Sequence, residues 1–337
     1  MGGLEHRSDQ ILAKVSLTAI ISNDKKAIDK LIEAASKDGC FYLDISDTPD
    51  LFDASDQIAQ VAESFFHLPL EEKLRYEMDK FTNLHMGGYK AVGKHSGVKP
   101  GKRDAFENFL VPLSAVLGLE ENLMPWPAAI ERHLHLLTWF KIECHKICQQ
   151  ILTALSGALD KNDIPFEESH RLQERSTTAL AMLKYPPTSA LQADNSGHMA
   201  HTDVGSLTLL FTKSPGLEAY RESISSWTAV PPQPGFVIVN IGDALSFMSG
   251  QRFPSCLHRV VPITAATRFS LAYFHRPELA AKFRDGQGQD WTGESWHRAK
   301  YQLFRADNQA QASSSLLTGR VNFLGHLDER RESRIIA

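Results

Sequence analysis

The stretch that decides the fold spans residues 199–211 and reads Met-Ala-His-Thr-Asp-Val-Gly-Ser-Leu-Thr-Leu-Leu-Phe. It places His201 two residues before Asp203, ahead of an apolar run. In an extended strand, residues i and i+2 project to the same face, so this imidazole and this carboxylate would converge on one point, as metal ligands must. A second His-x-Asp, at His326 and Asp328, is followed by only nine residues, none of them histidine. The first copy is therefore the candidate metal site.

Further polar residues follow the first copy at spacings that suit the same site. His258 comes 55 residues after Asp203, and Arg268 comes ten residues after His258, two before Ser270. Two neutral imidazoles and one carboxylate form a facial triad that leaves positions on Fe(II) open. Zinc sites also use three protein ligands, and a metal-free polar cluster would need the same side chains. The triad alone therefore leaves the metal undecided.

Arg268 and Ser270 favour iron with a carboxylate co-substrate. A guanidinium on a strand beside a metal offers a fixed fork for a carboxylate, and a hydroxyl on the same strand face adds a hydrogen bond. The open positions on the metal leave room for a bidentate co-substrate and for O2. The pair suits the distal carboxylate of 2-oxoglutarate.

The chain resembles the isopenicillin N synthase-like family of iron(II)/2-oxoglutarate dioxygenases over about residues 15 to 305, through the ordered motifs His201-x-Asp203, His258 and Arg268-x-Ser270 and the upstream Tyr185-Pro186. The resemblance implies that the triad binds the catalytic iron(II), and that Arg268, Ser270 and Tyr185 contact 2-oxoglutarate. The implied reaction converts 2-oxoglutarate and O2 to succinate and CO2 while a second substrate is oxidised, with ascorbate as the reductant in vitro. Hydroxylation is the default outcome, but desaturation, epoxidation and ring rearrangement use the same kind of site.

The same resemblance points to four residues near the prime substrate, namely Phe274, His198, Leu183 and Tyr89. Phe274 stands where relatives place a substrate-facing aromatic, although a core phenylalanine fits the position equally well. His198 is expected near the mouth of the pocket. Leu183 replaces an Asn that relatives often carry, and Tyr89 lies in a Gly- and Lys-rich stretch that borders the substrate pocket in relatives. The lysines of that stretch, Lys90 among them, are expected to face solvent.

The pattern of apolar residues along the chain predicts an α+β fold. Helical spacing predicts helices over residues 51–66 and 128–159, with a further helix over residues 291–304. From residue 177 onward, short apolar runs alternate with Gly and Pro, which favours a sandwich or barrel. The family fold is a double-stranded β-helix (jelly roll). The expected strands cover residues 178–185, 206–212, 216–220, 227–230, 236–241, 258–263 and 269–274.

We therefore expect a jelly-roll core flanked by helices, with a helix-rich N-terminal region. The expected divisions are an N-terminal dioxygenase region (1–115), a helical spine and connector (116–175), the catalytic jelly roll (176–280), and a C-terminal helix and tail (281–337).

Bulk composition excludes several classes of partner. A net charge of −4, from 36 Lys and Arg against 40 Asp and Glu, gives no attraction to nucleic acid or an anionic membrane. No apolar run approaches the ~18 residues of a membrane helix, and the first residues lack the apolar region of a signal peptide. Four scattered cysteines are typical of free thiols in a reducing cytosol, so we expect a cytoplasmic protein. Its partner is expected to be a small organic metabolite, by resemblance one of secondary metabolism, and its oligomeric state stays open.

Two other functions fit the same motifs. An isopenicillin N synthase-type oxidase would take its electrons from its own substrate without 2-oxoglutarate, and would keep Arg-x-Ser to hold a substrate carboxylate. A non-catalytic jelly-roll binding protein is the more distant alternative, because a decayed site has no reason to keep the whole triad and the arginine together. Turnover of 2-oxoglutarate to succinate separates all three.

Overall fold

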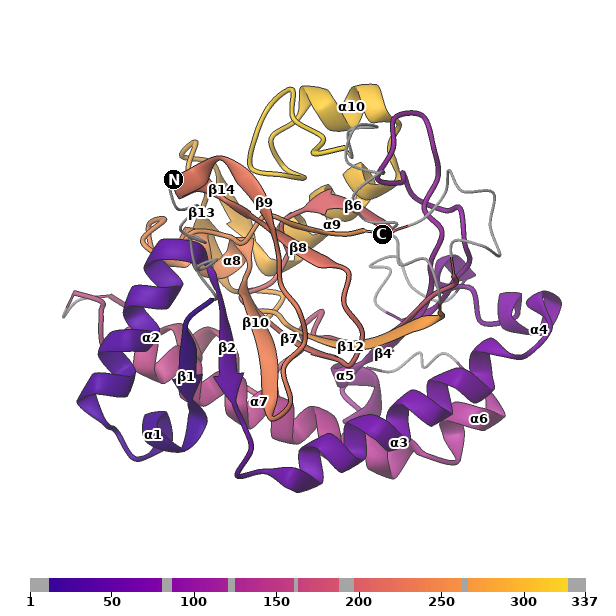
Figure 1. Ribbon diagram of the computed structural model, residues 1–337, viewed down its shortest axis with the longest axis horizontal. Helices are drawn as coiled ribbons and strands as arrows, with labels where there is room; N and C mark the ends of the chain where they lie inside the picture. The colour runs from indigo at the N-terminus through magenta and orange to yellow at the C-terminus, as the bar shows by residue number, and fades with distance from the viewer. Residues whose placement is uncertain are drawn as a thin grey trace, which may run out of the picture.

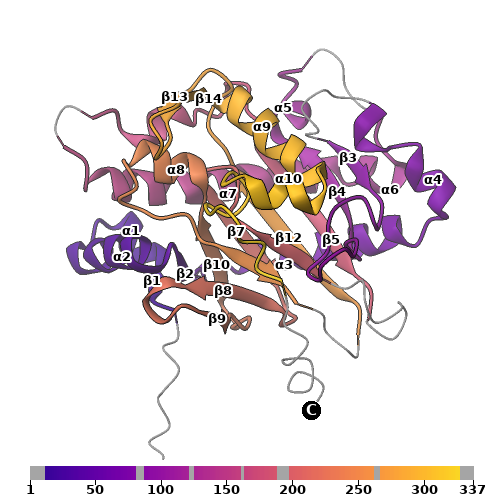
Figure 2. The same ribbon diagram turned by 90° about the horizontal axis from the view of Figure 1, so that it is seen from above.

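The structure is a computed structural model that describes residues 12–80, 87–120, 125–160, 163–187, 197–261 and 266–326 (Figure 1). Two β-sheets face one another, and helices cover the outer face of the larger sheet. Helices α1 (Leu17–Ile21) and α2 (Lys25–Asp38) lie at one edge of that sheet, while α4 (Leu70–Leu74) and α6 (Ala128–Glu131) lie at the opposite edge (Figure 2). No helix in these ranges is long and apolar enough to cross a membrane.

The large sheet joins strands from both halves of the chain. Its neighbours pair antiparallel except for the first two, which are parallel. The order is β1 (Lys14–Ser16), β2 (Cys40–Asp44), β10 (Phe236–Ile241), β7 (Leu207–Thr212), β12 (Arg268–His275), β5 (Ala179–Tyr185), β4 (Glu107–Pro112) and β3 (Gly88–Lys90). Strands that precede residue 115 thus share a sheet with strands that follow residue 176. The division of the chain at residues 115, 175 and 280 stays a prediction.

The small sheet is antiparallel and carries the candidate ligands. Its order is β6 (His198–His201), β11 (His258–Val260), β8 (Leu217–Arg221) and β9 (Ser226–Ala229). One apolar cluster contains Ala219 and Val260 from this sheet together with Leu210 and Ala272 from the large one, so it fills the space between the two sheets. This arrangement confirms the predicted jelly-roll core flanked by helices.

Alternate side chains of strand β12 belong to two different apolar clusters, one on each face of the large sheet. Ala272 and Phe274 point toward the small sheet, while Leu271 and Tyr273 belong to the apolar cluster under the helices. Successive residues of a strand face opposite sides, so Arg268 and Ser270 share the inner face with Phe274.

Helices on the outer face bury one stripe each. In α3 (Pro49–Phe66), Ile58, Ala62 and Phe65 recur at helical spacing and are buried against the sheet. Helix α7 (Leu134–Ser156) packs beside it. Helix α2 begins where the side chain of Asp24 caps the amide of Ala27, and it ends at Gly39 with φ of +61°. A Cβ on Gly39 would lie 2.2 Å from the carbonyl oxygen of Pro254, so only glycine fits.

The remaining elements are short, apart from one C-terminal helix. They comprise α5 (Leu113–Val116), α8 (Asp243–Met248), α9 (Gly293–Arg305), α10 (Asn308–Ser313), the hairpin of β13 (Lys282–Arg284) with β14 (Asp290–Thr292), and 3-10 turns at Met78–Lys80, Phe166–Ser169 and Glu222–Ile224.

Some expectations need correction. The helix expected over residues 128–159 is two helices, because α6 ends at Glu131 and α7 begins at Leu134; the apolar spacing continues across the break, so the pattern hid it. Lys90 is buried and does not face solvent. Its ammonium pairs with the Asp104 carboxylate at 2.5 Å and donates to the Phe106 carbonyl at 2.8 Å, which offsets the cost of burying the charge.

Candidate metal and co-substrate site

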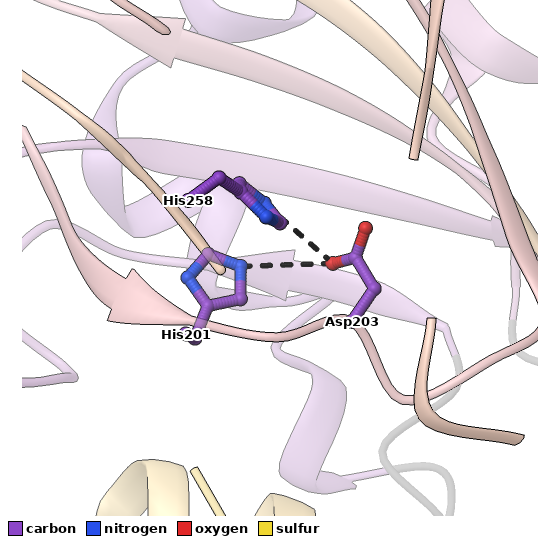
Figure 3. A group of neighbouring side chains, drawn as sticks. All are labelled: His201, Asp203 and His258. Carbon is purple, nitrogen blue, oxygen red and sulfur yellow. Dashed lines mark ion pairs between the residues drawn. The ribbon is translucent and has the colours of Figure 1, made fainter. Parts of the chain in front are cut away.

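The three candidate ligands come together at the edge of the small sheet (Figure 3). His201 is the last residue of β6 and pairs in register with His258, the first residue of β11. Asp203 lies two residues past the end of β6, and the chain bends directly after it, at residues 204–206. In the described ranges, this is the only group of three His, Cys, Asp or Glu side chains whose ligand atoms all lie within 4.8 Å of one another.

The two imidazoles are oriented by backbone carbonyls. Nδ1 of His201 lies 2.8 Å from the Met199 carbonyl oxygen, and Nδ1 of His258 lies 3.1 Å from that of Cys256. A carbonyl only accepts hydrogen bonds, so each Nδ1 carries a proton, and Nε2 is the ring atom left to bind a metal. Both Nε2 atoms point at Oδ1 of Asp203, at 3.6 Å and 3.8 Å. These three atoms are the ones that face a common point and can hold a metal.

The Asp203 carboxylate is also oriented. The Thr208 hydroxyl, on β7, donates to its Oδ2 at 2.6 Å, which leaves Oδ1 directed at the histidines. Burial alone would raise the pKa of Asp203, but the two imidazoles and the Thr208 hydroxyl outweigh it. The pKa of this carboxyl therefore lies below its usual range, so Asp203 is an anionic ligand at neutral pH.

Arg268 presents an unsatisfied hydrogen-bond donor inside the jelly roll. The side chain is buried; its Nε donates to the Pro215 carbonyl at 3.1 Å and its Nη1 to the Ser270 hydroxyl at 3.0 Å. Its Nη2 is buried without a partner. The guanidinium lies 4.9 Å from the centre of the Tyr185 ring, on the paired strand β5. Burial raises the pKa of Tyr185 to about 12, so its hydroxyl is a neutral donor. A buried cation with a free donor fits a carboxylate ligand.

One aromatic wall stands beside the triad. The ring of His198 lies 4.3 Å from that of His201 and 4.5 Å from that of Phe106, which in turn stacks on Tyr185 at 5.1 Å. Phe304, on α9, approaches His201 edge-on at 5.4 Å. His198 was expected in a loop but is the first residue of β6, and its ring lies against that of His201 in an aromatic setting.

The other expected substrate residues are spread more widely. Leu183 faces the inner cluster opposite Ser270, and Phe274 is half-buried on the same inner face. Tyr89 is not brought to the triad: its ring packs against Phe65 and its hydroxyl donates to Glu107 at 2.7 Å. The second His-x-Asp cannot be compared, because Asp328 lies outside the described residues.

Sequence reasoning missed Phe106, Thr208 and Phe304. Thr208 sits five residues after Asp203 on the inner face of a predicted strand. The alternation of side chains along that strand could therefore have placed its hydroxyl on the same side as the metal ligands. Phe106 comes 95 residues before His201 and Phe304 comes 46 residues after His258, and no local pattern connects them to the triad.

Comparisons with known proteins agree with this geometry. Residues 176–277 match the 2OG-Fe(II) oxygenase superfamily, and residues 13–121 match the model described as non-haem dioxygenase in morphine synthesis N-terminal. The 2-oxoglutarate-dependent dioxygenase frbH of Dothideomycetidae sp. is 34% identical over 312 residues, which are 91% of this chain and 95% of that protein. The 2-oxoglutarate-dependent dioxygenase iboH of Amanita muscaria is 42% identical over 200 residues, 57% of this chain and 96% of that protein.

A solved structure shows the same fold. A full-length Neurospora crassa protein, crystallised in complex with alpha-KG, superimposes with a TM-score of 0.70 at 20% identity, covering 87% of this chain and 96% of that one. The family expected from the order of the motifs is confirmed by matches to both halves of the chain. This protein belongs to the 2OG-Fe(II) oxygenase superfamily.

Proposed function

We propose that His201, Asp203 and His258 hold one iron(II) ion, and that Arg268 and Ser270 hold the distal carboxylate of 2-oxoglutarate. The observation that carries the proposal is the buried Nη2 of Arg268, which lacks a partner although the rest of its guanidinium is bonded. Leaving a charged donor unpaired in a core costs free energy. A carboxylate would satisfy it, and 2-oxoglutarate, the co-substrate of this superfamily, supplies one.

The residues act by binding and orientation. The bound iron, with 2-oxoglutarate and O2, supplies the oxidation of a second substrate with release of succinate and CO2. The Nδ1 protons of the histidines are donated to carbonyls, which leaves each Nε2 as the atom that would bind the metal. Thr208 keeps Oδ2 of Asp203 occupied, so the carboxylate offers one oxygen to the metal. Tyr185 stacks under Arg268 and donates its proton toward the co-substrate.

The prime substrate is a small organic molecule, by analogy with relatives that carry the name 2-oxoglutarate-dependent dioxygenase. Its pocket lies along the wall of His198, Phe106 and Phe304, with Phe274 and Leu183 on the inner face of the large sheet. Hydroxylation is the default reaction, within secondary metabolism. All four cysteines are buried free thiols, which supports a cytoplasmic location.

The decisive experiment measures the binding of 2-oxoglutarate to the Fe(II)-loaded protein without O2, and then its turnover when O2 is admitted. Adding it to protein with Fe(II) should produce the weak visible charge-transfer band of the chelate, and admission of O2 should yield succinate, slowly without a prime substrate. Asp203→Ala protein is the control and should give neither signal. Absence of the band and of succinate from wild-type protein would favour the oxidase, which needs only its own substrate. Incubating the enzyme with a metabolite extract and following mass changes would then find that substrate.

A further inference from the structure

The turn that carries two of the candidate ligands is held from outside the jelly roll. The side chains of His201 and Asp203 point toward each other and toward His258 (Figure 3), whereas the buried Thr202 between them has its hydroxyl bonded to Lys300, outside the triad. Helix α9 runs beside β6 at this place (Figure 1). The ammonium of Lys300, on α9, donates to the Thr202 hydroxyl at 2.6 Å. Thr202 is thus the side chain between the two ligands that α9 bonds directly.

Lys300 is fixed on its other side as well. It is completely buried and forms an ion pair with the Asp243 carboxylate, at the start of α8. The backbone amide of Asp243 donates to the carbonyl of Asp203 at 2.8 Å. Lys300 therefore links Thr202 to Asp243, and both ends of that link touch the ligand turn.

Two further bonds tie successive residues of the turn to the C-terminal region. The amide of Thr202 donates to the Leu317 carbonyl at 2.9 Å, and the indole of Trp296, on α9, donates to the Val204 carbonyl at 3.2 Å. With Lys300 and Asp243 these residues form a clasp around residues 202–204. Apart from Asp243, the clasp lies beyond residue 277, where the match to the oxygenase superfamily ends.

We propose that Lys300 is a positioning residue that acts through Thr202 to set His201 and Asp203 for metal binding. The proposal rests on the proposed metal triad. A buried ion pair is a poor source of stability, because well-packed apolar side chains do as well or better. The ion pair does fix the position of the segment that carries the ligands, because the Lys300 ammonium must reach both Thr202 and Asp243. Contacts behind metal ligands typically change metal affinity by about 10- to 100-fold.

Cobalt(II) provides a probe that needs no turnover. Its dissociation constant and its visible d–d spectrum would be measured for four proteins. Thr202→Val removes the hydroxyl that Lys300 reaches, together with that hydroxyl's own bond to the Leu317 carbonyl at 3.3 Å, and leaves the pair with Asp243 intact. Thr202→Ser restores the hydroxyl. Thr178→Val is the matched control, since Thr178 is equally buried and its hydroxyl bonds the backbone of Arg276 far along the chain.

We expect wild-type, Thr202→Ser and Thr178→Val proteins to bind cobalt alike, and Thr202→Val to bind it about tenfold more weakly with an altered spectrum. Lys300→Met should lose as much, and the double variant should lose clearly less than the two single losses combined, because both changes cut the bond between Lys300 and Thr202 and only the bond of Thr202 to Leu317 is separate. Should Thr202→Val not fold, Thr202→Ala takes its place in the same comparison.

The outcomes separate two failures. If wild-type protein binds cobalt no better than His201→Ala protein, the proposed triad itself fails. If wild-type binds at the triad but Thr202→Val binds equally well with the same spectrum, the positioning role of Lys300 is overturned. Additive losses in the double variant would overturn it too.

Discussion

Among the residues that the structure describes, buried histidines pack together at two places with opposite chemistry. The first is the triad of His201, His258 and Asp203. The second, the packed histidine cluster, consists of His145 on α7, His170 after the 3-10 turn at Phe166–Ser169, and His275 at the end of β12. Ring centres are 4.4 Å apart in the triad, and 4.9 Å separates His275 from each of the other two. Proximity of imidazoles therefore does not make a site.

The difference lies in where the nitrogens point. In the triad each Nδ1 is bonded to a carbonyl and each Nε2 faces one carboxylate oxygen. In the packed cluster His170 uses both nitrogens, on the Phe166 carbonyl and the Ser206 hydroxyl at 2.7 Å each, and neither nitrogen of His275 has a partner. The ring nitrogens of His145, His170 and His275 do not face a common point, so one metal ion could not bind all three rings. An anionic ligand and a common direction distinguish the metal site.

The largest expected effect comes from removing a ligand. His201→Ala should abolish turnover and metal binding, a loss greater than the roughly 10- to 100-fold that a contact behind the ligands is worth, while the fold persists. His275→Phe, in the packed cluster, is the matched control and should keep metal affinity unchanged. Metal content and succinate formation measure both variants. Full activity in the His201→Ala protein would refute the triad.

The second-largest effect should be a loss of folding stability at acid pH, caused by the packed histidine cluster. Burial lowers the pKa of His145 and of His170 to about 4, below the 6.5 of an unfolded histidine. Above pH 6.5 both states are neutral, so neither residue changes stability with pH. Below it the unfolded chain takes up protons that the folded one refuses, so stability falls between pH 6.5 and pH 4, by up to about 3 kcal/mol for each histidine.

Urea unfolding of metal-free protein at several pH values would measure this slope. Metal-free protein is needed because acid also releases metal from the triad. His145→Gln should flatten the slope, because the amide replaces an imidazole that titrates in the unfolded chain. A stability that stays constant from pH 7 to pH 4.5 would show that the packed cluster accepts protons without opening.

Arg268 and His275 both have a buried nitrogen without a hydrogen-bond partner, but only that of Arg268 is expected to bind a ligand. Arg268→Lys should weaken 2-oxoglutarate binding because a point charge cannot reproduce the fork, and Arg268→Gln should weaken it further. Losing a hydrogen bond to a charged group costs roughly 1.5–3 kcal/mol, or on the order of ten- to a hundredfold in affinity. Ser270→Ala should have the same effect more weakly. Metal affinity should not change, and a parallel loss of metal would mean that Arg268 supports the triad instead.

Sequence reasoning reached the triad and Arg268 because short motifs follow one another in an order and at spacings that resemble a known family. His-x-Asp sets two ligands on one short segment, and Arg-x-Ser sets two polar groups on one strand face. The packed histidine cluster gave no such signal, because its members come from three separate elements. Lys300 and Thr202 were missed for the same reason: 98 residues separate them, and a lysine in an amphipathic helix is normally read as exposed.

The strand predictions show the same limit. Residues 236–241 were predicted as a strand and are β10, because alternation within a strand is local. The short helix α8 was missed, since six residues hold less than two helical turns and show no period. The burial of Lys90 depends on Asp104, which the fold brings to it across the hairpin of β3 and the segment before β4.

The smallest effect concerns Phe274, which stands next to His275 on β12. Neighbouring residues of a strand face opposite sides, so Phe274 points into the jelly roll and His275 into the packed cluster under the helices. Phe274 is half-buried against the inner apolar cluster. A partly exposed ring on the face shared with Arg268 and Ser270 is placed to contact a bound substrate.

Phe274→Ala should therefore weaken binding of the prime substrate by about tenfold or less, the loss expected for part of a phenylalanine contact. Product ratios should shift, while uncoupled succinate formation stays the same. The matched control is Phe269→Ala, because Phe269 lies on the same strand, is also half-buried, and packs on the opposite face. It should lower the midpoint of urea unfolding without changing product ratios. A loss of about 3–5 kcal/mol of stability in Phe274→Ala, typical of a core phenylalanine, with unchanged products, would place Phe274 in the core and move the substrate wall to Phe106 and His198.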